Sequence, residues 1–258
     1  MIDREVVTPK VSIIAHTLTP EMTVAKAGKL CYSKVGVEQI EEKLTDEEVD
    51  RFVNMLSRIG HESPLEHAVF TFAVEGISRA CSHQIVRHRL ASYSQQSQRY
   101  VNLKENFIYI TPPEIEVFDE ANKIYIESMM SSFEAYVKIS SLLKDRYLSE
   151  GLFTGKNAER DAEKKAIEDA RYVLPNACET KMVFTMNART LLNFIKHRDC
   201  ERAQWEIREL TRAMVTELRK ISPKLFSRCG ANCRYGKCGE GNMSCQSPLP
   251  KWEDEIQC

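Results

Sequence analysis

The segment from Gly76 to Lys104 contains neither Asp nor Glu, although the whole chain balances 36 Lys and Arg residues against 37 Asp and Glu residues. Many Ser and Gln residues accompany its positive side chains and add uncharged hydrogen-bonding groups. Planar guanidinium groups are well suited to phosphate oxygens. The pattern predicts a pocket for a small phosphate-bearing anion, and a solvated polar loop is the alternative. The cations of this segment are Arg79, Arg87, Arg89, Arg99 and Lys104.

The composition excludes several other classes of protein. The chain has 258 residues and a formal net charge of −1, and such a balance excludes a general binder of polyanions. No uncharged apolar run approaches the ~20 residues that cross a bilayer, and the first residues do not resemble a signal peptide. The 9 cysteines are an odd number and cannot all pair internally. We therefore expect a globular cytoplasmic protein with reduced thiols and no membrane partner.

The spacing of apolar residues predicts an α+β fold, a mostly helical single domain with a small mixed or antiparallel sheet. This domain is expected to occupy residues 1–226, because a Gly- and Cys-rich tail follows at 227–258. Alternating or bounded apolar runs predict strands at residues 11–16, 70–74, 107–111 and 180–186.

Helix start and stop signals divide the rest of the chain. Thr45 and Glu48 form a capping box, and Gly60 supplies the end of the helix behind it. A second helix is predicted to begin at Thr19-Pro20, with Thr as the cap and Pro in the first turn. Further helices are expected at residues 77–87, 114–149, 158–174, 188–197 and 201–221.

The run Arg87-His88-Arg89-Leu90-Ala91-Ser92-Tyr93-Ser94-Gln95-Gln96-Ser97-Gln98-Arg99-Tyr100 carries a family signature. It resembles the motif of flavin-dependent thymidylate synthases, in which Arg-His-Arg is followed by Ser and then by Arg-Tyr. Other blocks match that family in order and spacing, and the resemblance extends from about residue 11 to residue 226. These blocks are residues 60–67, 70–72, 171–175, 187–189 and 198–206.

The resemblance implies a reductive methylation of dUMP to dTMP. The family uses FAD, takes the one-carbon unit from 5,10-methylenetetrahydrofolate and takes electrons from NADPH. The resemblance also implies a homotetramer whose active sites are built from several subunits, without a nucleic-acid partner. No Gly-x-Gly-x-x-Gly follows a predicted strand, so side chains rather than a Rossmann loop must hold the flavin nucleotide.

The family motifs carry specific roles onto this sequence. Arg198 matches the residue that favours ionisation of the uracil ring, although a helix C-terminal cation would also suit its position. The residues that match dUMP contacts are Gln84, Ile85, Val86, Arg87, Gln95, Gln96, Ser97, Gln98, Arg99 and Arg171. The residues that match FAD contacts are Ser63, Arg87, His88, Arg89, Gln95, Asn187, Arg189 and Asn193.

Three positions need separate interpretation. Ser97 is expected to donate a hydrogen bond to substrate rather than to act as a nucleophile, because no base with an orienting acid is evident. His61 matches an active-site histidine expected to orient folate or flavin. Gln95 stands where some family members carry Glu, so this sequence keeps hydrogen bonding there but loses a charge.

The tail poses a metal-binding question of its own. Cys229, Cys233, Cys238 and Cys245 have spacings of which the first two suit thiolate ligands of zinc or iron. Nearby glycines would let a short loop wrap a metal ion. Free thiols or a disulfide are the alternatives.

Two other functions stay open at this level. One is a different flavin-dependent transferase that modifies a nucleotide with another donor. The other is a module for single-stranded nucleic acid, in which Tyr93 and Tyr100 would stack on bases.

Overall fold

The computed structural model describes residues 8–104 and 107–255. The chain divides into two compact units. Of the described residues, unit 1 contains residues 8, 75–83, 95–104 and 107–181, and unit 2 contains residues 9–74, 84–94 and 182–255. The expected boundary at residue 226 therefore stays a prediction, and the Cys-rich tail lies within unit 2.

A four-stranded antiparallel sheet with the order β1-β2-β4-β3 is the common framework of the α+β fold. The predicted fold class is thereby confirmed. The strands are β1 (Lys10–His16), β2 (Val69–Ser78), β3 (Ser92–Gln95) and β4 (Glu179–Asn187).

Three of the predicted strands are confirmed, whereas the one expected at residues 107–111 is wrong. Its residues make only an isolated bridge, between Tyr109 and Cys178. Pro112 and Pro113 follow at once, and two residues without backbone N–H groups prevent the pairing from continuing. The short strand β3 lies instead inside the Ser/Gln-rich motif, where no strand was expected.

The Thr19 side chain makes no cap hydrogen bond, so the cap predicted there is wrong, although Pro20 begins the first of four helical segments at the start of unit 2. These are α1 (Pro20–Leu30), α2 (Val37–Lys43), α3 (Asp46–Ile59) and the 3-10 turn η1 (Ser63–His67). The Thr45 hydroxyl accepts a hydrogen bond from Glu48 N at 3.3 Å, and Gly60 ends α3 with a φ of 70°. The capping box and the glycine stop are both confirmed.

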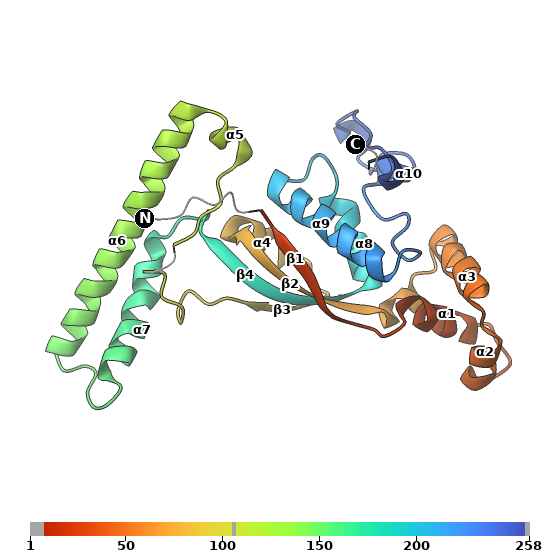
Figure 1. Cartoon of the computed structure of the whole chain (residues 1–258), viewed down its shortest axis with the longest axis horizontal. Coiled ribbons are helices and arrows are strands. Elements are labelled where there is room, and N and C mark those ends of the chain that lie inside the picture. Colours follow the sequence, from red (N-terminus) through yellow and green to blue (C-terminus); the bar gives the residue numbers. More distant parts are fainter. Residues whose placement is uncertain (1–7, 105–106, 256–258) are drawn as a thin grey trace. The chain divides into compact units, whose positions relative to one another are not determined.

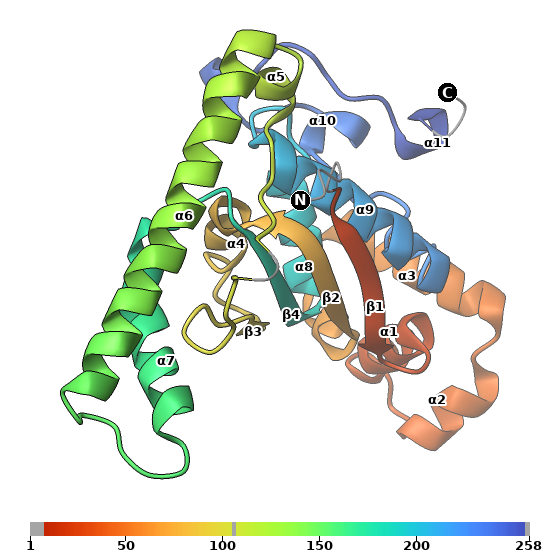
Figure 2. The ribbon, with the colours of Figure 1, turned by 60° about the vertical axis from the view of Figure 1, so that its left-hand side comes forward.

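Unit 2 continues with two longer helices and three short helical segments. They are α8 (Ala188–Arg198) and α9 (Trp205–Ile221), followed by α10 (Asn232–Tyr235), η3 (Gly241–Met243) and α11 (Trp252–Glu255). Helix α9 packs against β1 and against α8, as Figure 2 shows. Phe70, Phe72 and Phe194 are fully buried in this core.

Unit 1 is built around a pair of helices. Helices α6 (Asp119–Ser149) and α7 (Ala158–Ala170) lie side by side, and α7 continues into the 3-10 turn η2 (Arg171–Val173) (Figure 1). The expected helix 114–149 is thus interrupted between α5 (Pro113–Glu116) and α6. Phe107 stacks on Phe133 with ring centroids 4.9 Å apart, and Tyr136 and Ile167 are buried beside them.

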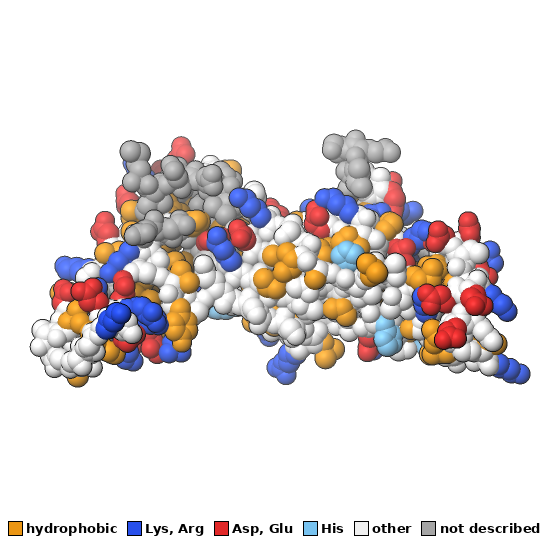
Figure 3. All heavy atoms as spheres, turned by 60° about the horizontal axis from the view of Figure 1, so that its bottom comes forward, with side chains coloured by type: hydrophobic (Ala, Val, Ile, Leu, Met, Phe, Trp, Pro, Cys, Tyr) orange, Lys and Arg blue, Asp and Glu red, His pale blue; other side chains and the backbone are white. Residues whose placement is uncertain are grey.

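The surface carries charges of both signs, as the near-zero net charge of the chain leads us to expect. Acidic and basic side chains lie next to one another on the face seen in Figure 3. Among the described residues, no helix is both long and apolar enough to cross a membrane.

Candidate active site

Arg198, the last residue of α8, is held against the Arg-His-Arg motif within unit 2. Its Nε donates to His88 Nε2 at 3.2 Å, and its Nη2 donates to the Gln84 carbonyl oxygen at 3.4 Å. Helix α4 (Arg79–Ile85) ends just after Gln84, so the guanidinium also touches that helix end. The structure thereby brings together three of the predicted site residues.

His88 is neutral in this setting. Its ring is half-buried and meets Phe194 edge-on at 4.6 Å between centroids. Burial, followed by the positive charge of Arg198 and by His197, lowers the pKa of His88 from 6.5 to about 4. A neutral ring whose Nε2 accepts from Arg198 carries its proton on Nδ1.

A cavity of about 610 Å³ lies beside this group, at the N-terminal half of α8. Its walls include five residues predicted to contact FAD, which are His88, Arg89, Asn187, Arg189 and Asn193. Lys196 adds a further cation. Five of the eight predicted FAD residues therefore share one cavity wall, which fits a large ligand with phosphate groups.

Asn187 is both a helix cap and a cavity residue. Its Oδ1 accepts from Thr190 N at 2.9 Å, so Asn187 caps the start of α8. The first N–H groups of α8 lie at the same end, and a helix N-terminus favours an anion.

Arg189 does not stand as an isolated cation. Its Nε donates to Glu62 at 3.1 Å and its Nη1 to Glu66 at 2.5 Å, and both carboxylates line the same cavity. The side chains are about half-exposed, so water screens these pairs. The two glutamates were not predicted as site residues, and their only signal was their place in the block around His61.

Tyr93 fixes the loop that carries the motif. Its hydroxyl oxygen lies 2.7 Å from the His88 carbonyl oxygen and 2.9 Å from the Ile85 carbonyl oxygen, and its one proton is donated to this pair of acceptors. Burial raises the pKa of Tyr93 to about 12, so the hydroxyl remains a donor. The Ile85 side chain is fully buried, whereas Val86 is exposed, so Ile85 has mainly its backbone to offer a substrate.

Within unit 1, two cations predicted to contact dUMP meet at Glu168. Arg99 Nη2 lies 3.4 Å from the Glu168 carboxylate, and Arg171 Nε donates to the Glu168 carbonyl at 3.1 Å. Arg171 also lies over the Tyr172 ring at 5.8 Å. Helix α7 and turn η2 therefore position both guanidiniums.

Arg79 organises the Ser/Gln stretch, although it matched no dUMP or FAD position of the family motifs. Its Nη1 donates to Gln96 O at 3.4 Å and to Thr180 Oγ1 at 3.3 Å, and its Nη2 donates to Gln98 Oε1 at 3.3 Å. Burial lowers the pKa of Arg79 from its ordinary value. The signal was available, because Arg79 is the first cation of the acid-free segment.

Gln95 and Ser97 are already engaged in local structure. The Gln95 amide donates to Ser82 Oγ at 2.8 Å and to Thr180 Oγ1 at 3.1 Å. Ser97 Oγ accepts from Arg99 N at 3.2 Å, as a turn-forming serine does. A hydroxyl that accepts a backbone N–H can still donate its own proton, which suits the predicted role of Ser97 as a donor.

The remaining predicted residues lie elsewhere in unit 2. His61 Nδ1 is 2.9 Å from the Tyr32 hydroxyl, beyond the end of α1. Ser63 begins η1 and is exposed, as is Arg87, and neither is among the residues that line the 610 Å³ cavity.

The four-cysteine metal set predicted for the tail is not assembled. Cys229 is buried, its thiol lies 3.1 Å from Phe226 O, and burial raises its pKa to about 12. Cys233, Cys238 and Cys245 instead line another cavity, together with Cys200. Across residues 8–104 and 107–255, no group of three or more His, Cys, Asp or Glu side chains is placed to hold a metal ion.

Taken together, these features describe an α+β protein whose cation-bearing sites suit phosphate-bearing ligands. Residues 12–224 match the family described as thymidylate synthase complementing protein. The chain is 57% identical over 236 residues to a flavin-dependent thymidylate synthase of Clostridium tetani, covering 92% of each chain. Similar proteins of that name occur in Geobacter sulfurreducens, 42% identical over 92% of this chain and 93% of the relative, and in Pyrococcus furiosus, 35% identical over 95% and 96%. The chain belongs to the flavin-dependent thymidylate synthase family.

Proposed function

We propose that this chain methylates dUMP to dTMP, using FAD, 5,10-methylenetetrahydrofolate as the carbon donor and NADPH as the reductant. The observation that carries the proposal is the contact of Arg198 with His88, because it joins two family motifs that are 110 residues apart. The class of enzyme follows from the family: a flavin-dependent methyltransferase.

For the flavin, the proposal assigns the cavity at the start of α8. Arg89 and Arg189 would hold the pyrophosphate with the first N–H groups of the helix, and Asn187 and Asn193 would bind the polar sugar chain. Ser63, Arg87 and Gln95 are proposed as further contacts from the same motifs. When bound, FAD supplies the electron transfer that the side chains of this protein cannot perform.

The phosphate and the uracil of dUMP would be bound by different groups of side chains. Arg99 and Arg171 would bind the phosphate dianion, with Gln96, Ser97 and Gln98 as hydrogen-bonding neighbours. Arg198 would face the uracil, where a guanidinium that is always charged stabilises an anionic ring without giving up a proton. Neutral His88 keeps the Arg198 Nε occupied, so the rest of the guanidinium is held in a fixed orientation.

The proposal includes the oligomeric state of the protein and its cellular location. A homotetramer with shared active sites would let residues of unit 1 and unit 2 reach one substrate from different subunits. We propose a cytoplasmic location, where dUMP, folate and NADPH are available as small molecules.

The experiment that tests the function is a direct assay with three readouts. Purified protein is expected to be yellow, to retain FAD after desalting, and to form dTMP from dUMP, methylenetetrahydrofolate and NADPH. Bound flavin without dTMP formation would point to another flavin-dependent transferase. Colourless protein that takes up no added FAD but binds single-stranded oligonucleotides would overturn the proposal in favour of a nucleic-acid module.

A further inference from the structure

A buried ion pair joins the residue next to Arg198 to the Cys-rich tail. Asp199 follows Arg198 at the end of α8, and its side chain is fully buried, as is that of Arg234 on α10. Arg234 Nε donates to Asp199 Oδ2 at 2.5 Å, and Nη2 donates to Oδ1 at 2.9 Å. The pair therefore has the two-pronged geometry that gives an Arg–carboxylate contact its directional precision.

Residues of the tail and of α9 surround this ion pair. Asp199 Oδ2 also accepts from Ala231 N at 2.9 Å, and Arg234 Nη1 donates to Pro250 O at 2.6 Å. The Trp252 ring lies 3.6 Å from the guanidinium carbon of Arg234. On the helix side, Arg212 of α9 adds a second cation, with its Nε 3.6 Å from Asp199 Oδ1. The tail thus supplies a donor to the carboxylate, and an acceptor and an aromatic ring to the guanidinium.

Gly230 makes the enclosure possible. Its φ is 133°, a conformation that residues with a side chain rarely adopt. A Cβ at this position would lie 2.6 Å from Arg234 Cδ and 3.1 Å from Asp199 Oδ2. Any larger residue at position 230 would therefore push directly into the ion pair.

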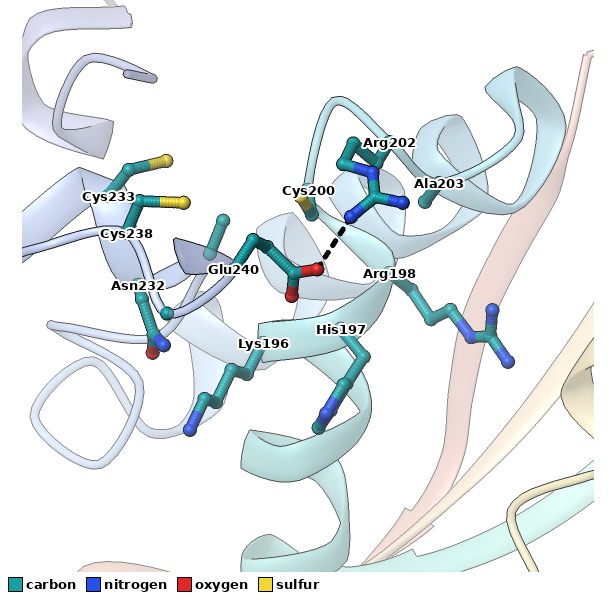
Figure 4. Close-up of a pocket in the computed structure, with 12 residues that line it drawn as sticks. Lys196, His197, Arg198, Cys200, Arg202, Ala203, Asn232, Cys233, Cys238 and Glu240 are labelled. Carbon is teal, nitrogen blue, oxygen red and sulfur yellow. Dashed lines mark hydrogen bonds and ion pairs between the residues drawn. The ribbon is translucent and has the colours of Figure 1, made fainter. Parts of the chain in front are cut away.

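Arg198 and Asp199 point to different partners although they are neighbours in sequence. Arg198 contacts His88 and Gln84, and Figure 4 shows its side chain extending away from the tail segment that carries Cys233 and Cys238. Asp199 is bound to the tail itself. Burying two charges is costly, so such a pair is weak evidence for added stability, and its best-attested use is to specify a geometry.

We propose that Asp199 and Arg234 are positioning residues for Arg198. By fixing the main chain at the end of α8, the pair sets the direction in which Arg198 reaches the substrate. This inference rests on the proposed role of Arg198 toward uracil. It makes residues 230–252, which lie beyond the family match at 12–224, a working part of the enzyme.

The test compares two variants with a matched control. Arg234→Lys keeps the charge but loses the two-pronged contact, and Gly230→Ala disturbs the pair from the backbone. Glu240→Gln is the control, because Glu240 also ties the tail to the loop after α8, through Arg202 at 2.8 Å, but in an exposed pair. We expect both variants to raise the KM for dUMP or lower kcat by about 10-fold or more, with unchanged flavin content. Glu240→Gln should stay within about twofold of the parent.

A double-mutant cycle separates positioning from simple structural support. The dissociation constant of dUMP is measured by calorimetry for the parent, Arg198→Ala, Arg234→Lys and the double variant. If Arg234 acts through Arg198, Arg234→Lys weakens dUMP binding in the parent but adds nothing in the Arg198→Ala background. Equal weakening in both backgrounds would overturn the inference.

Two other outcomes are also decisive. Variants that melt at lower temperature but keep the parent kcat and KM would make the pair structural only, which contradicts the inference. A parent enzyme that forms no dTMP would remove the proposed function instead, and the two failures are therefore distinguishable.

Discussion

At the scale of single residues, the chemistry depends on which groups are charged. Arg198 keeps its charge at any working pH, whereas His88 is held neutral by burial and by the nearby guanidinium. One permanent cation and one neutral ring form a hydrogen bond in which the direction of donation is fixed. A protonated His88 would instead repel Arg198 and lose its acceptor.

Removal of the Arg198 guanidinium should separate flavin binding from turnover. We expect Arg198→Ala to keep its FAD and to lose about 100-fold or more in kcat, because the charge that stabilises the uracil anion is gone. Flavin absorbance and dTMP formation measure the two effects. Arg160→Ala, at an exposed position of α7, is the control. Turnover of Arg198→Ala within a few-fold of the parent would refute the role of Arg198.

The neutral state of His88 should appear in the pH dependence of stability. The pKa is 6.5 in the unfolded chain and about 4 in the folded chain, so the unfolded chain binds more protons between these values. Stability contributed by neutral His88 is therefore complete above about pH 6.5 and declines as the pH falls toward 4. Urea unfolding at about pH 7 and about pH 5 measures the decline.

The comparison variant for this titration is His88→Gln, which keeps an acceptor but cannot titrate. The difference in unfolding free energy between the two pH values should be smaller in His88→Gln than in the parent. An identical pH dependence in the parent and in His88→Gln would show that His88 is not the group responsible.

At the scale of elements, α8 presents different functions on different faces. Arg189, Asn193 and Lys196 recur at helical spacing and line the large cavity together with Asn187, the cap before the helix. Arg198 is two residues after Lys196 and points in another direction, as Figure 4 shows. One helix therefore carries the proposed flavin contacts at its start and the proposed uracil contact at its end.

The charge of Arg189 should matter for flavin and not for overall stability. We expect Arg189→Gln to weaken FAD binding by about 10-fold, because a charge-assisted contact to phosphate is lost. Fluorescence titration of apoprotein with FAD gives the affinity. Arg146→Gln is matched, since Arg146 pairs with Glu150 at 2.8 Å on the exposed surface of α6. Equal FAD affinity in Arg189→Gln and the parent would place the pyrophosphate elsewhere.

At the scale of the whole molecule, contacts between residues close together in the sequence could be predicted, whereas contacts between distant segments could not. Thr45 and Gly60 act through neighbours within a few residues, so both ends of α3 could be predicted from sequence. Asp199 and Arg234 are 35 residues apart, and nothing in either neighbourhood indicates the other. Cys229 illustrates the same limit, because spacing along the chain does not reveal which thiol becomes buried.

The same distinction between local and distant contacts applies to the motif residues. The resemblance supplied Arg99, Arg171 and Arg198, but it could not supply the partners that orient them. The contacts of Glu168 with Arg99 and Arg171 became visible only when α7 and η2 were placed within unit 1. Function could therefore be predicted from motifs, whereas positioning depends on contacts between distant segments.

The proposed sharing of active sites between subunits makes a prediction for mixtures of inactive chains. Arg99 belongs to unit 1 and Arg198 to unit 2, and in a shared site they can come from different subunits. Arg99→Ala and Arg198→Ala should each be nearly inactive alone. Co-expressed and purified as mixed tetramers through two affinity tags, they should recover about a tenth or more of parent activity, because some sites then contain both intact residues. Light scattering verifies the tetramer first, against a chain mass of 29.6 kDa. Mixed tetramers as inactive as either variant would mean that Arg99 and Arg198 of each site come from the same subunit.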